Sequence, residues 1–112
     1  DFAEAMNYLG YMWADLGKNL DEAAALLEKA VKAEPKNAAF LDSLAWVYFK
    51  LNRHQEAFEY ITRAVQLSGE PDPVLFDHLG DICHALGRKE EARDALEKYI
   101  ALDPNDAIKT KM

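Results

Sequence analysis

A pattern of 34 to 35 residues that occurs three times is the feature that most constrains the fold of this chain. Two series of residues carry the period: alanines that each follow a glutamate, and leucines that lie earlier in each unit. They are Ala23, Ala57 and Ala92, and Leu9, Leu44 and Leu79. A fixed period of roughly 20 to 50 residues is typical of arrays whose units stack on one another. We therefore expect one structural unit used three times, with its function on a surface rather than in a catalytic pocket.

The apolar residues inside each unit follow the spacing of two amphipathic helices. In the second unit, Leu41, Leu44 and Tyr48 share one helical face, and a second apolar face begins at Ala57. No segment has the alternation of a β-strand. The pattern predicts six helices, at about residues 2–16, 21–34, 38–51, 54–68, 73–86 and 89–102.

Residues with special backbone preferences stand at several of these helix ends. Gly17 and Gly87 suit the left-handed conformation that often ends a helix. Asp72 before Pro73 is typical of an N-cap followed by proline in the first turn. Asp21 is expected to cap the second helix.

The residues that recur in each unit follow one order: a large apolar residue, Leu-Gly, an aromatic residue, an alanine, a second large residue, another alanine and a proline. They are Met6, Leu9, Gly10, Trp13, Ala23, Leu27, Ala30 and Pro35; Leu41, Leu44, Ala45, Tyr48, Ala57, Ile61, Ala64 and Gly69; and Phe76, Leu79, Gly80, Cys83, Ala92, Leu96, Tyr99 and Pro104. This order resembles the motif of the tetratricopeptide repeat (TPR) family over residues 2–106, with departures at Gly69, Cys83 and Tyr99.

The resemblance implies an all-α fold, a right-handed α-α superhelix of three TPR helix-turn-helix units. We expect a single TPR domain over residues 1–112, with repeats at about 3–37, 38–72 and 73–106 and a tail at 107–112. The segment from Ala107 to Met112 is a candidate for the start of a seventh, capping helix. The chain has no initiating Met and opens inside a helical pattern, so we expect a fragment of a longer TPR protein, whose compartment the sequence leaves open.

The resemblance also implies a concave groove, lined by the first helix of each unit, in which a protein partner binds. The residues off the core stripe of these helices give the groove its predicted character. They are Asn7, Tyr11, Asp42, Trp46, Phe49, Asp77, Asp81 and His84. Aromatic rings offer large contact areas, and carboxylates select cationic side chains. We therefore predict an acidic and aromatic groove for an extended or helical peptide with apolar anchors and Lys or Arg.

A second interpretation of the same residues is structural. The aromatic side chains of Trp46 and Phe49 could pack against a neighbouring repeat, and the chain could be a segment that stacks on further repeats or self-associates through exposed terminal helices without a ligand of its own. One TPR subclass holds the carboxylate tails of chaperones with Lys, Asn and Arg. The corresponding positions here are Asn7, Tyr11, Ser43, Val74 and His78, which lack the cations, so binding of that type is not expected.

Other classes of function have little support. The net charge of −7 argues against a nucleic-acid partner and favours cationic or apolar ones, unless the charge serves solubility alone. No apolar run approaches the ~18 residues of a membrane span. Asp77, Asp81 and His84 share a helix face, but a solvated groove explains them better than a metal site. With no nucleophile motif and no Gly-rich phosphate loop, we expect neither an enzyme nor a cofactor.

Overall fold

The computed structural model describes residues 2–69 and 72–102, and all of the regular secondary structure in these residues is α-helical. Six helices follow in order, α1 to α6, and they differ from the predicted ranges by at most one residue at either end. Their bounds are α1 Phe2–Leu16, α2 Leu20–Ala33, α3 Ala38–Lys50, α4 His54–Leu67, α5 Pro73–Ala85 and α6 Lys89–Leu102.

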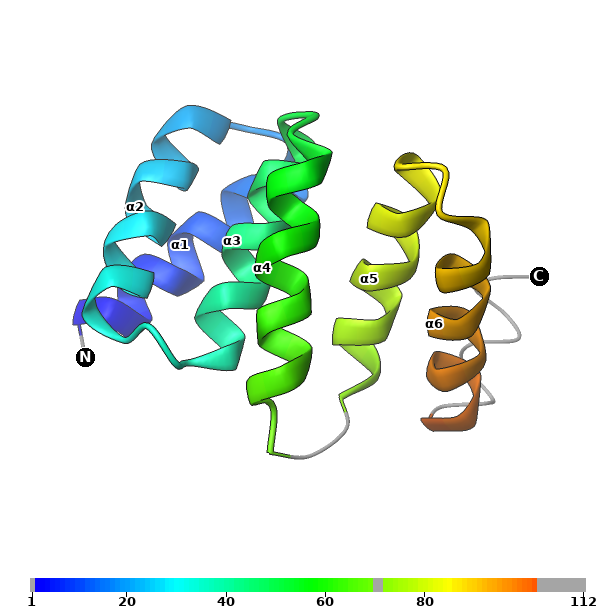
Figure 1. The fold of residues 1–112 in the computed structure, drawn as a ribbon. Helices are drawn as coiled ribbons and strands as arrows, with labels where there is room; N and C mark the ends of the chain where they lie inside the picture. Colours follow the sequence, from blue (N-terminus) through cyan, green and yellow to red (C-terminus); the bar gives the residue numbers. More distant parts are fainter. Residues whose placement is uncertain (1, 70–71, 103–112) are drawn as a thin grey trace.

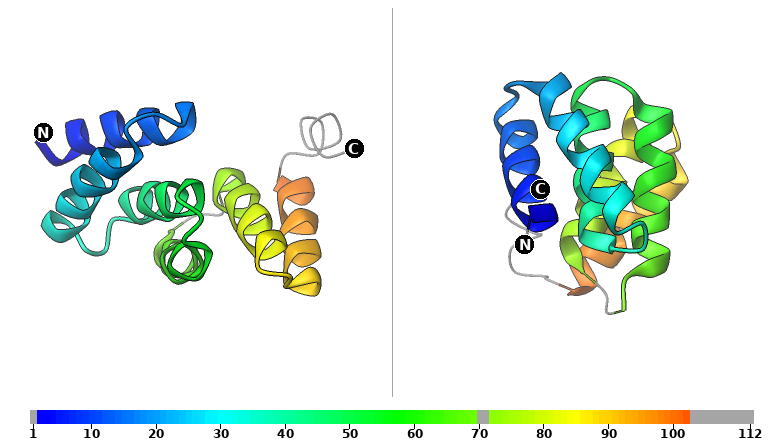
Figure 2. Two further views of the ribbon diagram at one scale, coloured as in Figure 1. Left: turned by 90° about the horizontal axis from the view of Figure 1, so that it is seen from above. Right: turned by 90° about the vertical axis from the view of Figure 1, so that its left-hand side faces the viewer.

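The helices form three antiparallel hairpins, α1/α2, α3/α4 and α5/α6, that lie one after another along the molecule (Figure 1). The first helix of each following hairpin packs on the hairpin before it: α3 contacts both α1 and α2, and α5 contacts both α3 and α4. The view from above shows the hairpins turning progressively from one to the next (Figure 2). The predicted all-α superhelix of TPR units is therefore confirmed.

The short turns inside the hairpins use left-handed residues, as the sequence predicts for two of them. Gly17 and Gly87 have φ values of 69° and 76°, and Asn52 takes the corresponding place in the second hairpin with a φ of 63°. The Asp72 side chain accepts a hydrogen bond from the Val74 N–H at 3.0 Å, which confirms the predicted cap of α5.

The start of α2 differs from the prediction. The N-cap is Asn19, with a φ of 49°, and it makes no side-chain capping hydrogen bond. The predicted cap, Asp21, lies inside the first turn instead, where its negative charge interacts favourably with the helix dipole. The expectation that Asp21 caps the helix was wrong because helical geometry already begins at Leu20.

The centre of the core is α3, which is surrounded by helices of all three hairpins. Every residue from Phe40 to Tyr48 is buried, an unbroken run that a helix with one solvent face cannot show. Leu27, Ile61 and Ile82 pack around it from α2, α4 and α5 and have no exposed surface. Burying each of these side chains contributes about 1.5–3 kcal/mol. The apolar core therefore includes contacts within each hairpin as well as contacts between hairpins.

The predicted repeat limits remain predictions. Pro104 and the tail at 107–112, for which a capping helix is predicted, lie outside the described residues. Within the described residues, no helix combines the length and the apolar character that crossing a bilayer requires.

Candidate functional site

The predicted groove residues occupy three equivalent positions on α1, α3 and α5. Each position recurs at an interval of 35 residues, so the three helices present corresponding side chains to the same side of the array. The three sets are Asn7, Asp42 and Asp77; Tyr11, Trp46 and Asp81; and Ala14, Phe49 and His84. Along these equivalent positions the side chains change from mainly amide and aromatic groups on α1 and α3 to carboxylates and an imidazole on α5.

The structure places Asp42 and Trp46 under the third hairpin rather than on the open groove surface. Asp42 is 7 % exposed and Trp46 is 8 % exposed. Their partner is His78 of α5, which is itself 4 % exposed. Nδ1 of His78 donates a hydrogen bond to Oδ1 of Asp42 at 2.7 Å, and the indole ring of Trp46 stacks on the imidazole with centroids 4.0 Å apart. These two groove residues therefore join the second repeat to the third.

Tyr11 of α1 approaches the same cluster. Its ring centroid lies 6.3 Å from that of His78. The pKa of the Tyr11 phenol is raised, mainly by burial and further by the charges of Asp15, Asp42 and Asp77. Side chains from all three repeats thus meet around Tyr11, which is half-buried and so retains surface that a ligand can contact.

Phe49 extends the aromatic group toward the end of α3. It is half-buried, and its ring stacks on Trp46 with centroids 5.0 Å apart and lies 5.2 Å from the ring of His54. The ammonium group of Lys50 lies 5.0 Å from the centre of the Trp46 ring. A cation already rests on this aromatic surface within the chain itself.

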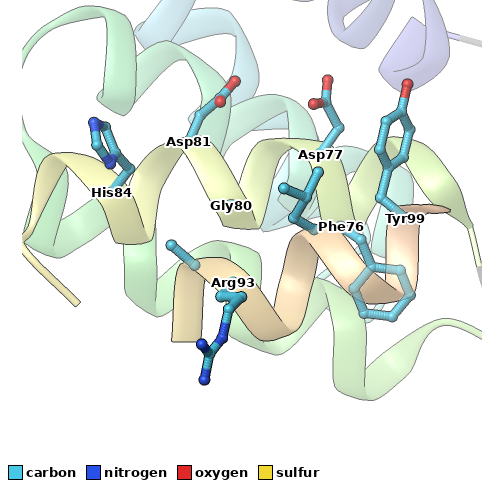
Figure 3. Close-up of a pocket in the computed structure, with 9 residues that line it drawn as sticks. Phe76, Asp77, Gly80, Asp81, His84, Arg93 and Tyr99 are labelled. Carbon is cyan, nitrogen blue, oxygen red and sulfur yellow. The ribbon is translucent and has the colours of Figure 1, made fainter. Parts of the chain in front are cut away.

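Of the remaining four predicted groove residues, Asn7 is half-buried on α1. The other three, Asp77, Asp81 and His84, line a pocket of about 450 Å³ between α5 and α6 (Figure 3). Its lining residues are Phe76, Asp77, Gly80, Asp81, His84, Ala92, Arg93, Leu96 and Tyr99. Figure 3 shows the carboxylates of Asp77 and Asp81 and the hydroxyl of Tyr99 on one side of the pocket, whereas Arg93 points to the opposite side. We call this space the α5/α6 pocket.

These side chains do not assemble into a metal centre. Across residues 2–69 and 72–102, no three His, Cys, Asp or Glu side chains are placed to hold an ion together. Cys83, which lies near His84 in sequence, is fully buried and faces the core. Burial raises the pKa of its thiol, with a further increase from the charge of Glu91, so the thiol stays protonated.

Sequence reasoning did not identify His78 as the centre of the site, nor Arg93, Leu96 and Tyr99 as lining residues of a pocket. His78 follows Asp42 by 36 residues, one repeat plus one position, and that offset could have indicated a contact between adjacent units. The three α6 residues were missed because the predicted groove was drawn from the first helices alone.

Comparisons with known proteins agree with this architecture. The family model described as "Anaphase-promoting complex, cyclosome, subunit 3" matches residues 17–99. A TPR repeat-containing protein of Pseudomonas aeruginosa is 37 % identical over 81 residues, which are 72 % of this chain and 13 % of that protein. The cytochrome c-type biogenesis protein CycH of Rhizobium meliloti is 32 % identical over 99 residues, 83 % of this chain and 25 % of that protein. The chain thus spans a quarter or less of the length of these relatives.

Among solved structures, the first TPR domain of Spaghetti (RPAP3) bound to the HSP90 peptide SRMEEVD superposes with a TM-score of 0.83. It is 27 % identical, and the match covers 93 % of this chain and 81 % of that domain. Proteins with this repeat are typically non-enzymatic scaffolds. The period of the sequence, the stacked hairpins and these matches lead to one conclusion: this chain is a member of the tetratricopeptide repeat family.

Proposed function

We propose that the chain is a protein-interaction module that binds a peptide or partner segment in its concave groove, along α1, α3 and α5. The observation that carries the proposal is that side chains of three repeats meet at Tyr11. The tyrosine ring lies near His78, and the charges of Asp42 and Asp77 contribute to the raised pKa of its phenol. A peptide that lies across this point contacts three structural units at once. The similar RPAP3 domain holds a peptide, which supports an interaction module in general.

The chemistry of the groove favours a partner with apolar anchors and with Lys or Arg. Tyr11 and Phe49 keep part of their rings accessible, and aromatic side chains give contact area at a low entropic cost. Asp77 and Asp81 place two carboxylates farther along the groove. A cationic side chain is attracted by these carboxylates, while a carboxylate of a partner is repelled.

Two buried polar atoms in the groove support a main-chain ligand. The indole N–H of Trp46 and the side-chain oxygen of Asn7 have no hydrogen-bond partner within the described residues. A buried donor or acceptor without a partner is destabilising by about 1–3 kcal/mol. A peptide group that reaches these atoms through a small side-chain movement can recover part of that free energy, because it offers both a carbonyl oxygen and an N–H.

An acidic chaperone tail suits this groove poorly. The peptide SRMEEVD held by the RPAP3 domain contains two adjacent glutamates and ends in aspartate. In this chain, His78 is buried and its Nδ1 already bonds to Asp42, so the imidazole is not accessible to a carboxylate of a peptide in the groove. We therefore expect SRMEEVD to bind far more weakly than a basic peptide with aromatic or leucine anchors.

The test is selection from a displayed library of random 16-residue peptides on the immobilised full chain, followed by affinity measurement by fluorescence anisotropy. We expect enrichment of Lys or Arg together with large apolar residues. Tyr11→Ala should weaken the selected peptides about tenfold, an effect of a central interface aromatic. Tyr8→Ala is the matched control, because Tyr8 is on the same helix, is 66 % exposed and lies outside the groove set. Equal affinities of the two variants would contradict the proposal, as would tight binding of SRMEEVD.

A second candidate function is a segment that stacks end to end, and a specific observation favours it. The outer face of α1 carries exposed large apolar side chains, including Tyr8, Leu9, Met12 and Leu16. Leu44 and Val47, the equivalents of Leu9 and Met12 in the second repeat, are buried there under the first. Sedimentation velocity across a range of concentrations separates the candidates: association that Met12→Glu abolishes favours stacking, and a monomer at all concentrations favours the interaction module.

A further inference from the structure

The α5/α6 pocket corresponds, residue for residue, to surfaces that are covered in the first two repeats. Its nine lining residues have equivalents 35 residues earlier on α3 and α4, and all nine equivalents are buried or half-buried. They are Leu41, Asp42, Ala45, Trp46, Phe49, Ala57, Phe58, Ile61 and Ala64. The helix that covers them is α5, which packs on both α3 and α4, and α3 packs in the same way on α1 and α2.

The filled surface of the second hairpin shows how a helix is recognised there. When α5 packs on the second hairpin, it places His78 against Asp42, and Trp46 stacks on the imidazole. The imidazole ring of the incoming helix is therefore held by one carboxylate and one aromatic ring. In the third repeat the positions of Asp42 and Trp46 are occupied by Asp77 and Asp81, two carboxylates.

Two other lining positions also change from aromatic to polar side chains. His84 replaces Phe49, and Arg93 replaces Phe58. Between these polar edges the pocket remains apolar and open. A Cβ atom built on Gly80 comes no closer than 3.8 Å to the nearest atoms, which belong to Ala92 and Ala95. The pocket thus combines an apolar floor with an acidic edge on one side and Arg93 on the other (Figure 3).

We propose that the α5/α6 pocket binds an amphipathic helix of a partner protein that carries Lys or Arg at the position where α5 carries His78. The cation lies against Asp77 and Asp81, and an apolar side chain of the same helix lies over Gly80 and Leu96. Two carboxylates within one contact favour a full positive charge more strongly than the single carboxylate beside His78 does. The geometry of the occupant is that of α5 on the second hairpin.

Charge complementarity argues against a second copy of this chain as the occupant. The helix that a second copy offers with an exposed apolar face is α1, which contains no Lys or Arg and carries Glu4 and Asp15. Docking α1 into the pocket brings carboxylates toward Asp77 and Asp81, and like charges at an interface oppose binding.

This inference rests on the proposed function in so far as Asp77 and Asp81 belong to both surfaces, but it names a different contact, made by α6. The probes are two synthetic peptides with the sequence of residues 72–86, in which Asn replaces Asp77 and Asp81 so that the peptide brings no carboxylate of its own to the acidic edge. One peptide carries H78R and the other H78E. Binding to the full-length ¹⁵N-labelled chain is followed by NMR chemical shifts. We expect the H78R peptide to bind about tenfold more tightly than the H78E peptide, because a favourable charge contact is replaced by a repulsive one. The shifted signals should include those of Leu96 and Tyr99.

Three variants test the contacts. Asp77→Asn combined with Asp81→Asn should reduce the preference for the H78R peptide to within about twofold, because the charges that select the cation are gone. Gly80→Leu should abolish binding of both peptides by filling the floor of the pocket. Asp94→Asn is the matched control on α6: its carboxylate is exposed, pairs with Lys98 and lies outside the pocket, so the preference should remain.

The alternatives give different results. Equal affinity for both peptides, or shifts confined to α1 and α3, would overturn the inference. Concentration-dependent shifts on α1 and α6 without any peptide would assign the pocket to a second copy. If the H78R peptide binds the Lys109→Glu/Lys111→Glu variant but not the wild type, the occupant of the pocket would be the C-terminal residues of the chain itself. Two variants separate the inference from the proposed function. Tyr11→Ala should weaken the library peptides but not the H78R peptide, and Gly80→Leu should weaken the H78R peptide but not the library peptides. If only the first result is seen, the inference fails; if only the second is seen, the proposed function fails.

Discussion

Nδ1 of His78 in the third repeat donates a hydrogen bond to Oδ1 of Asp42 in the second, over 2.7 Å, and both side chains are buried. Trp46 covers the imidazole from one side, and Tyr11 of the first repeat approaches it as well. Removing one partner of such a contact lowers stability more than the net energy of the hydrogen bond itself, because a buried donor without an acceptor is strongly unfavourable. It fixes the position of α5 against α3.

Replacing Asp42 with alanine should therefore lower the free energy of unfolding by about 1–3 kcal/mol, because the buried His78 N–H loses its acceptor. Urea denaturation of the single variants and of the Asp42→Ala/His78→Ala double variant measures this. The double variant should lose less than the sum of the two single changes. Glu56→Ala, which removes an exposed partner of Arg53, is the control and should change stability much less. Additive losses at Asp42 and His78 would contradict the coupling.

Two glycines at equivalent places in the first and third repeats should respond in opposite ways to substitution by alanine. A Cβ on Gly10 would lie 2.6 Å from Cγ of Leu27, closer than packed atoms allow, so Gly10→Ala should destabilise the fold by about 1–3 kcal/mol through overpacking. A Cβ on Gly80 meets ordinary contact distances, so Gly80→Ala should stabilise α5 by up to about 1 kcal/mol. Thermal unfolding followed by circular dichroism measures both, and a loss of stability in Gly80→Ala would show that the α5/α6 pocket is tighter than described.

Tyr48 should make the fold sensitive to alkaline pH. Burial raises the pKa of its phenol, and the hydrogen bond that the hydroxyl donates to Glu28 at 2.5 Å raises it further. The folded state then holds the proton while the unfolded chain releases it above pH ~10, so this contribution to stability is present below that pH and is lost as pH rises. Tyr48→Phe should lose less stability than the wild type between pH 9 and 11 in urea titrations. Tyr8→Phe, which changes an exposed tyrosine, should follow the wild type.

Cys83 should react slowly with thiol reagents in the native protein. Its side chain is fully buried and its pKa is raised by that burial, so both access and thiolate formation are suppressed. With Ellman's reagent we expect a rate at least about 100-fold lower in buffer than in 6 M guanidinium chloride, because reaction requires local opening. A Cys83→Ser/Ala25→Cys variant carries its thiol on the exposed face of α2 and should react rapidly in buffer. Fast native reaction of Cys83 would show that the contact of α5 with the core opens readily.

The sequence by itself determined the repeat, the helices and the core. The 35-residue period from Leu9 to Leu44 to Leu79 shows that one unit recurs. The helices within each unit could be predicted because backbone hydrogen bonds in a helix, and the apolar face it buries, depend on residues near in sequence. For the same reason the left-handed Gly17 and Gly87 and the capping Asp72 could be predicted from their residue types.

Tertiary structure decided which of the predicted groove residues are buried and which line an open pocket. Sequence spacing placed Asp42 and Trp46 on the groove face of α3, but whether that face meets solvent depends on the angle at which the next hairpin packs. Packing of α5 buried them against His78 and left Asp77 and Asp81 beside an open pocket. Equivalent residues therefore differ in exposure: Asp42 and Trp46 are buried, whereas Asp77 and Asp81 are half-buried. Burial is set by neighbours far away in sequence, and a repeat pattern does not by itself specify which of its copies is covered.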